Sequence, residues 1–170
     1  RPTVVFRGRP TVVFRGRPTV VFRGYNYHMT NFRYYLPIQI RYADLDPQWH
    51  VNNARTLVFV EQGRFTYLRH LNLWDGVDFF KLGLIVADVH IAYLEPITWE
   101  QNIRVGVRVS RIGTKSLTFE YLVEDATTGK ALATAETVMV AFDYHRHTSI
   151  PVPEDWRRKI AAYEGWDAQV

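Results

Sequence analysis

The segment Arg41-Tyr-Ala-Asp-Leu-Asp-Pro-Gln-Trp-His-Val-Asn-Asn-Ala-Arg55 joins an alternating apolar run to a long apolar one. It gathers two carboxylates, one imidazole and two carboxamides at that junction. Asn52 and Asn53 are favoured N-cap residues, so a helix is expected to begin there. A helix start presents unpaired N–H groups and a partial positive charge. A carboxylate beside it could act on a carbonyl group whose oxygen the amides bind, either by attacking the carbon or by activating water.

Length and composition limit the possible classes. The 170 residues fit one domain, and a hydrophobic content of 47% is enough for a core. Cysteine is absent, which excludes disulfides, cysteine–zinc sites and a thiol nucleophile. No apolar run approaches the ~20 residues of a membrane helix. Regular arginines in residues 1–24 do not fit a secretory signal peptide, so we expect a cytoplasmic protein without a membrane partner.

Residues 1–24 are three identical copies of Arg-Pro-Thr-Val-Val-Phe-Arg-Gly, with six arginines and no acidic residue. Without those six, 15 of the 21 basic residues remain against 17 acidic ones. The basic charge therefore belongs to the repeat and does not predict a nucleic-acid partner. The octapeptides are too short to be solenoid repeats, whose units have roughly 20–50 residues. His28-Met29, which follows them, resembles a cloning junction. We predict that residues 1–28 are a tag or designed segment and that residues 29–170 form the functional domain.

Hydrophobic periodicity gives the expected order of elements. We expect strands at residues 34–42, 84–94, 103–109, 117–123 and 131–142, a long helix at 53–71 and a short helix at 153–163. The strands after the long helix are joined by short turns. This order predicts an α+β fold in which a curved antiparallel sheet wraps round one long central helix.

The long helix is apolar on most sides. One stripe contains Ala54, Leu57, Val58, Phe65 and Leu68, whereas Phe59, Val60 and Tyr67 lie off this stripe. A helix of this kind is expected to be enclosed rather than laid on a surface.

Two motifs resemble those of a known family. Asp44-Leu-Asp-Pro-Gln-Trp-His-Val-Asn-Asn53, followed by Val60-Glu-Gln-Gly-Arg64, is similar to the hot-dog-fold acyl-CoA thioesterases, in particular the hydroxybenzoyl-CoA thioesterase branch. Tyr93-Leu-Glu-Pro96 and Gly113-Thr-Lys-Ser116 also look like family features. The likeness covers roughly residues 36–144, nearly the whole domain.

The resemblance implies roles for two residues of the first motif. The family's catalytic carboxylate is the second Asp of the pair, which matches Asp46. Its carbonyl-polarising amide lies seven positions later and matches the backbone N–H of Asn53. From the residues alone, Asp46-Pro47 is also a common turn initiator, so a purely structural role stays open. The implied activity is acyl-CoA thioester hydrolysis without a metal or redox cofactor, with coenzyme A entering as part of the substrate.

Five further residues are weaker site candidates. His50 is a possible base or substrate contact, although many such histidines are only structural. Trp49 replaces a small family residue and could line the acyl pocket, and we place Asn52 among the substrate contacts as well. Arg111 and Lys115 flank a turn and could bind coenzyme A phosphates, or simply be solvated. His50 lacks a second ligand at metal-binding spacing, so no metal site is expected.

Two other carboxylates lie in or near the first motif. Asp44 is expected to orient the loop by accepting backbone hydrogen bonds. Glu61 is a rival catalytic acid, because another thioesterase branch places its acid within the central helix. The alternative is that Glu61 pairs with an arginine such as Arg64 or Arg55.

Two other functions remain open at this point. A hot-dog hydratase or dehydratase would use Asp46 and His50 as an acid–base pair. An oligomeric scaffold carrying engineered repeats would need no catalytic residue. For any of these functions, an exposed sheet edge and face predict a homodimer with a continuous sheet. The resemblance favours a homotetramer, with the active site at the dimer interface.

Overall fold

The computed structural model describes residues 12–15, 17–20, 32–78, 80 and 83–166, and the chain divides into two units, 1–31 and 32–170. In the first unit, β1 (Val12–Arg15) pairs with β2 (Arg17–Val20) in an antiparallel ladder. Both strands lie within the triplicated repeat. The origin of residues 1–28 as a tag stays a prediction.

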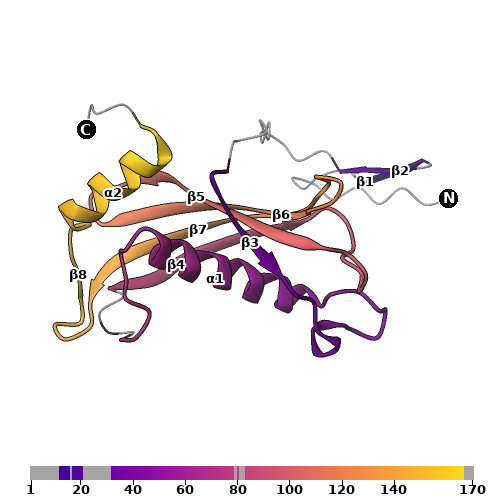
Figure 1. Ribbon diagram of the computed structural model, residues 1–170, viewed down its shortest axis with the longest axis horizontal. Helices are drawn as coiled ribbons and strands as arrows, with labels where there is room; N and C mark the ends of the chain where they lie inside the picture. Colours follow the sequence, from indigo (N-terminus) through magenta and orange to yellow (C-terminus); the bar gives the residue numbers. More distant parts are fainter. Residues whose placement is uncertain (1–11, 16, 21–31, 79, 81–82, 167–170) are drawn as a thin grey trace. The chain divides into compact units, whose positions relative to one another are not determined.

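The second unit contains one antiparallel sheet with the strand order β3-β5-β6-β7-β4, and β8 pairs with β7 (Figure 1). The strands are β3 (Tyr34–Ile38), β4 (Leu84–Tyr93), β5 (Ile103–Ile112), β6 (Ser116–Asp125), β7 (Ala131–Asp143) and β8 (Thr148–Ser149). The helices are the 3-10 helix η1 (Tyr42–Asp44), α1 (Asn53–His70) and α2 (Glu154–Glu164). The curved sheet with one long helix against it is the α+β arrangement expected from the sequence (Figure 1).

Most element boundaries agree with expectation, and the first strand is the main exception. It ends at Ile38 rather than at residue 42, and the chain then turns into η1. Because of this turn, the chain leaves the sheet and continues as the loop that leads into α1. No helix among the described residues is long and apolar enough to cross a membrane.

Alternating residues of β5, β6 and β7 form the face that packs on α1. Val107, Tyr121 and Ala135 are aligned across these three strands and are all buried. Gly63 of α1 lies directly over β5, since a Cβ there would be 3.0 Å from methyl groups of both Val105 and Val107. The absent side chain therefore allows close approach of the helix to the sheet.

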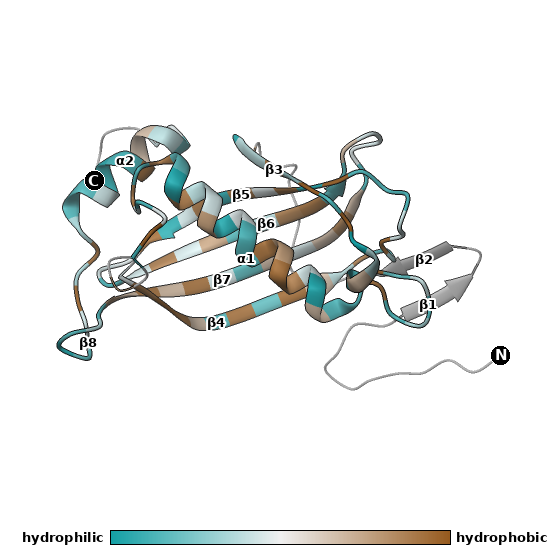
Figure 2. Ribbon diagram, turned by 60° about the horizontal axis from the view of Figure 1, so that its bottom comes forward, coloured by the Kyte–Doolittle hydropathy of each residue, from teal (hydrophilic) through white to brown (hydrophobic). Residues whose placement is uncertain are grey.

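The apolar stripe of α1 is buried only in part, with Leu68 in the core. Phe59, Val60 and Tyr67 are buried, whereas Leu57 and Val58 are 38% and 41% exposed. Figure 2 shows that hydrophobic and hydrophilic residues both occur along α1. The helix lies on one face of the sheet in this chain rather than being enclosed. Periodicity did not distinguish the two apolar faces, because which face meets the sheet depends on the close approach at Gly63.

The two edges of the sheet differ. Beyond the start of β3, the β5 edge meets α2, whose Glu164 carboxylate accepts hydrogen bonds from the Val109 N–H and the Tyr67 hydroxyl. Burial raises the pKa of Glu164 above its ordinary value. At the other edge, β4 is the last strand, and Val86 and Val89 are 44% and 40% exposed. An apolar edge of this length is a pairing surface.

Candidate active site

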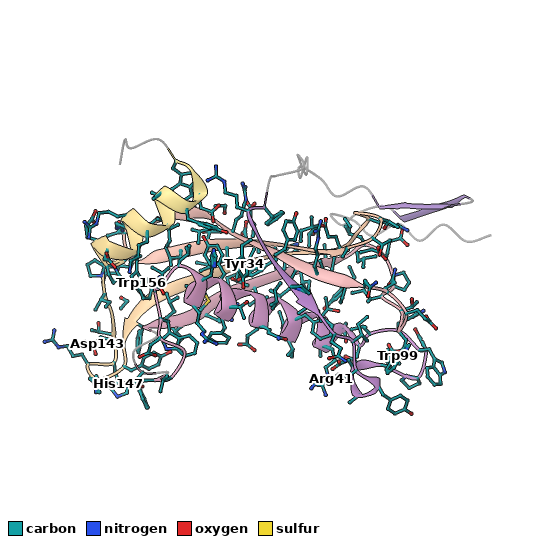
Figure 3. All side chains as sticks on the ribbon, viewed as in Figure 1. Tyr34, Arg41, Trp99, Asp143, His147 and Trp156 are labelled. Carbon is teal, nitrogen blue, oxygen red and sulfur yellow. The ribbon has the colours of Figure 1, made fainter. Side chains whose placement is uncertain are left out.

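The loop before α1 is tied to the connection between β4 and β5. The Val51 N–H donates to the carbonyl oxygen of Ile97 at 2.8 Å, and His50 forms an isolated β-bridge with Thr98. Figure 3 shows Arg41 and Trp99, one from each segment, at the same end of the sheet. The sheet therefore fixes the position of the loop at the start of α1.

Asp44 is fully buried and holds the loop from within. Its carboxylate accepts the Arg41 N–H at 2.8 Å and the Arg41 guanidinium at 3.0 and 3.2 Å, and the Arg55 Nε lies 3.8 Å away. Burial alone would raise the pKa of Asp44, but the hydrogen bonds and charge of Arg41 outweigh it and lower the pKa. The structure thus gives Asp44 the orienting role expected from the sequence.

Asp46 is half-buried in the next turn of the chain. Its Oδ1 accepts the backbone N–H groups of Gln48 and His50, at 2.8 and 3.3 Å. Its Oδ2 has no hydrogen-bond partner among the described residues. One oxygen therefore fixes the carboxylate to its loop, and the other is not engaged by the described residues.

The first turn of α1 has one unpaired donor. The Asn52 side chain caps the helix by accepting the Ala54 N–H at 2.9 Å, which also meets the Asn53 Oδ1 at 2.9 Å. The N–H groups of Arg55 and Thr56 donate to the Asn52 carbonyl at 2.8 and 3.2 Å. In the described part of the chain, the Asn53 N–H finds no acceptor. A bound oxygen can therefore accept from Asn53 without displacing a hydrogen bond.

His50 and Trp49 lie in the same turn but differ in their contacts. The His50 backbone N–H binds Asp46, whereas its imidazole makes no hydrogen bond to any residue that the structure describes. Trp49 is 66% exposed at φ 62°, a backbone region that bulky residues seldom adopt. Its ring contacts Tyr42 edge-on, with centroids 6.3 Å apart, and Tyr42 contacts Trp99 in the same way. Within one protomer, Trp49 therefore belongs to an exposed aromatic cluster.

Arg111 and Lys115 lie at the other end of the sheet. Lys115 donates to the backbone oxygen and hydroxyl of Ser149 in β8, at 3.1 and 3.2 Å. The end of the sheet near β8 and α2 carries Asp143, His147 and Trp156 in Figure 3, opposite Arg41 and Trp99. A single protomer therefore does not bring Arg111 or Lys115 to the loop of Asp46.

Glu61 lies on the solvent side of α1. Its carboxylate is half-exposed and 3.4 Å from the buried Arg64 guanidinium, which is the pairing considered from the sequence. In the residues that the structure covers, no group of three or more His, Asp or Glu side chains could hold a metal ion.

Sequence reasoning missed the contact of Tyr93 with the helix start. Its hydroxyl, at the end of β4, donates to the carbonyl oxygen of Asn53 at 3.0 Å. Burial raises the pKa of Tyr93. No local pattern predicts this hydrogen bond, because the two residues are 40 positions apart in the chain.

Comparisons with known proteins identify the family of this chain. Residues 40–160 match the family described as the thioesterase-like superfamily. The chain is 23% identical over 123 residues to the long-chain acyl-CoA thioesterase FadM of Escherichia coli, covering 72% of this chain and 93% of that protein. It is 28% identical over 111 residues to the uncharacterized protein YsmA of Bacillus subtilis, covering 65% of this chain and 74% of YsmA.

A solved structure indicates the same class of protein. A Thermus thermophilus thioesterase, crystallised with coenzyme A and zinc, is 33% identical with a TM-score of 0.68, over 77% of this chain and 94% of that one. The fold and these matches thus define a hot-dog thioesterase, as the resemblance implied. The chain belongs to the thioesterase-like superfamily, and it is a thioester hydrolase.

Proposed function

We propose that this protein hydrolyses acyl-CoA thioesters, using the Asp46 carboxylate and the backbone N–H of Asn53. The named activity of the E. coli relative and the coenzyme A bound to the T. thermophilus structure support this substrate class. The proposed route uses groups of the chain itself together with water.

One observation carries the proposal: the Asn53 N–H is the donor in the first turn of α1 without an acceptor among the described residues. The same turn satisfies the amides of Ala54, Arg55 and Thr56 internally. A thioester oxygen would therefore bind at one defined amide, with the partial positive charge of the helix start behind it.

The reaction follows from this arrangement. With the carbonyl oxygen on the Asn53 N–H, the free Oδ2 of Asp46 attacks the carbonyl carbon. The carbonyl electron pair moves to the oxygen, and its return expels the coenzyme A thiolate. Water then cleaves the mixed anhydride on Asp46. Alternatively, Asp46 takes a proton from an attacking water and the thiol leaves directly. A covalent acyl group on Asp46, detected by mass spectrometry after rapid quenching, distinguishes the first route from the second.

The remaining candidates have supporting roles in this proposal. Asn52 and Trp49 border the loop of Asp46 and would contact the acyl or pantetheine portion of the substrate. His50 would hold water or substrate with its unpaired imidazole. Arg111 and Lys115 would bind coenzyme A phosphates at a site completed by another copy of the chain, since one protomer separates them from Asp46.

The structure also supports a proposed dimer. Val86 and Val89 on the open β4 edge are exposed, and so are Leu57 and Val58 of α1. Pairing of β4 with β4 of a second copy would extend the sheet and cover apolar surface. The dimer interface would then lie near the start of α1, and two dimers would form the homotetramer expected from the resemblance.

Replacing Asp46 with asparagine tests the assignment of the carboxylate. We expect Asp46→Asn to lower kcat on acyl-CoA substrates by at least about 100-fold with folding intact, because the carboxamide is neither nucleophile nor base. Coenzyme A release is followed with a thiol-reactive dye. Full activity in Asp46→Asn would remove the assignment.

Asp143→Asn is a matched control. Its carboxylate also closes a turn, accepting the N–H groups of His145 and Arg146 at 2.9 Å each, but at the opposite end of the sheet (Figure 3). We expect wild-type kcat in this variant. Following the absorbance of an enoyl-CoA in parallel separates hydrolysis from the hydratase reaction.

A further inference from the structure

We propose that Tyr93 is a positioning residue that fixes the orientation of the Asn53 amide at the start of α1. The inference rests on the proposed function, in which that amide binds the thioester oxygen. The Tyr93 hydroxyl donates to the Asn53 carbonyl oxygen at 3.0 Å and so joins the last residue of β4 to the first residue of α1.

Tyr93 is well anchored to the sheet. Its backbone pairs with Ala133 of β7, and the next two N–H groups, of Leu94 and Glu95, donate to the Leu132 carbonyl at 2.9 and 3.1 Å. The hydroxyl therefore projects from a fixed point in the sheet. The hydroxyl is protonated and able to donate at neutral pH, because the ordinary pKa of tyrosine is about 10 and partial burial raises that of Tyr93 further.

The peptide that precedes the Asn53 N–H along the chain is held as well, on the side away from Tyr93. The Asn52 N–H donates to the Asp44 carbonyl at 2.8 Å, and the Asp44 carboxylate is locked by Arg41. The peptide N–H of Asn53 thus lies between two anchors, Asp44 before it and Tyr93 after it. Both anchors leave this N–H itself unpaired.

Such anchoring matters because the first turn of a helix frays easily. A donor that already points at the developing oxyanion needs no reorganisation during the reaction. A donor N–H displaced by a fraction of an ångström stabilises the oxyanion of the transition state less well, whereas substrate binding elsewhere is unchanged. The effect of Tyr93 should therefore appear in kcat rather than in KM.

Tyr93→Phe removes only the hydroxyl, and Tyr144→Phe is its matched control. The Tyr144 hydroxyl also donates to a backbone carbonyl, that of Leu84 at 2.8 Å, at the opposite end of β4. We expect Tyr93→Phe to lower kcat about tenfold with KM unchanged, and Tyr144→Phe to keep the wild-type kcat. Equal losses of kcat in both variants, a full kcat in Tyr93→Phe, or a rise of its KM alone would overturn the proposal.

Amide hydrogen exchange tests the anchor without relying on activity. The N–H groups of Arg55 and Thr56, which donate to the Asn52 carbonyl, should exchange faster in Tyr93→Phe than in the wild type or in Tyr144→Phe. Unchanged exchange would show that the hydroxyl does not hold the helix start. A wild-type protein inactive on every acyl-CoA tested would instead count against the proposed function, and the exchange result would still decide the role of Tyr93.

Discussion

The Asn52 side-chain oxygen accepts the Ala54 N–H at 2.9 Å, and this bond helps to leave Asn53 with the unpaired amide of the first helical turn. The Ala54 N–H, which this bond satisfies, would otherwise compete with the Asn53 N–H for a bound oxygen. In the proposed mechanism, the N-cap therefore shapes the oxygen-binding amide as well as stabilising the helix.

Replacing Asn52 separates these two roles. We expect Asn52→Ala to lower the free energy of unfolding by about 1 kcal/mol, whereas Asn52→Asp keeps the cap and most of the stability. Thermal unfolding should show a loss of about 2–4 °C in the alanine variant only. If the Asn52 amide nitrogen also contacts substrate, KM rises in both variants. Equal stability of the alanine variant and the wild type would contradict the capping role.

The buried Asp44 should make stability depend on pH in the acid range. Its pKa is lowered in the folded protein, so its contribution is complete above the unfolded pKa of about 4 and is lost as pH falls through the lower folded value. The stability advantage of the wild type over Asp44→Asn should therefore shrink below about pH 4. Urea unfolding at several pH values measures it, and an advantage that grows toward acid pH would contradict this account.

Charges on the exposed apolar face of α1 should break the proposed dimer. Leu57→Glu with Val58→Glu places two carboxylates where side chains are 38% and 41% exposed in the protomer, so the fold should persist. We expect the double variant to be monomeric by light scattering at micromolar concentration, where the wild type is dimeric or larger. Ala162→Glu, on the exposed side of α2, is the control and should keep the wild-type mass. A monomeric wild type would refute the dimer itself.

The sequence predicted the parts of this protein that depend on local rules. The carboxamides Asn52 and Asn53 indicated the start of α1, because capping is a property of neighbouring residues. Alternation gave the long strands within a few residues, and the comparisons confirmed the hot-dog thioesterase fold.

Contacts between distant segments were not predictable in the same way. The bond between Tyr93 and Asn53 and that between Tyr67 and Glu164 each join elements far apart in the chain. Periodicity likewise did not show which face of α1 is buried, since the fit of Gly63 on β5 selects that face. The separation of Lys115 from Asp46 also follows from topology rather than from any local motif.

The central claim concerns the backbone N–H of Asn53, and proline removes that group. Asn53 is the first helical residue, where proline is well tolerated, and Asn52 already has the extended conformation (φ −57°, ψ 138°) that precedes proline. The most direct measurement is therefore kcat of Asn53→Pro beside Asn53→Ala, with circular dichroism to confirm folding. We predict a loss of at least about 100-fold for proline and at most about threefold for alanine. A folded proline variant with the kcat of the alanine variant would contradict the account.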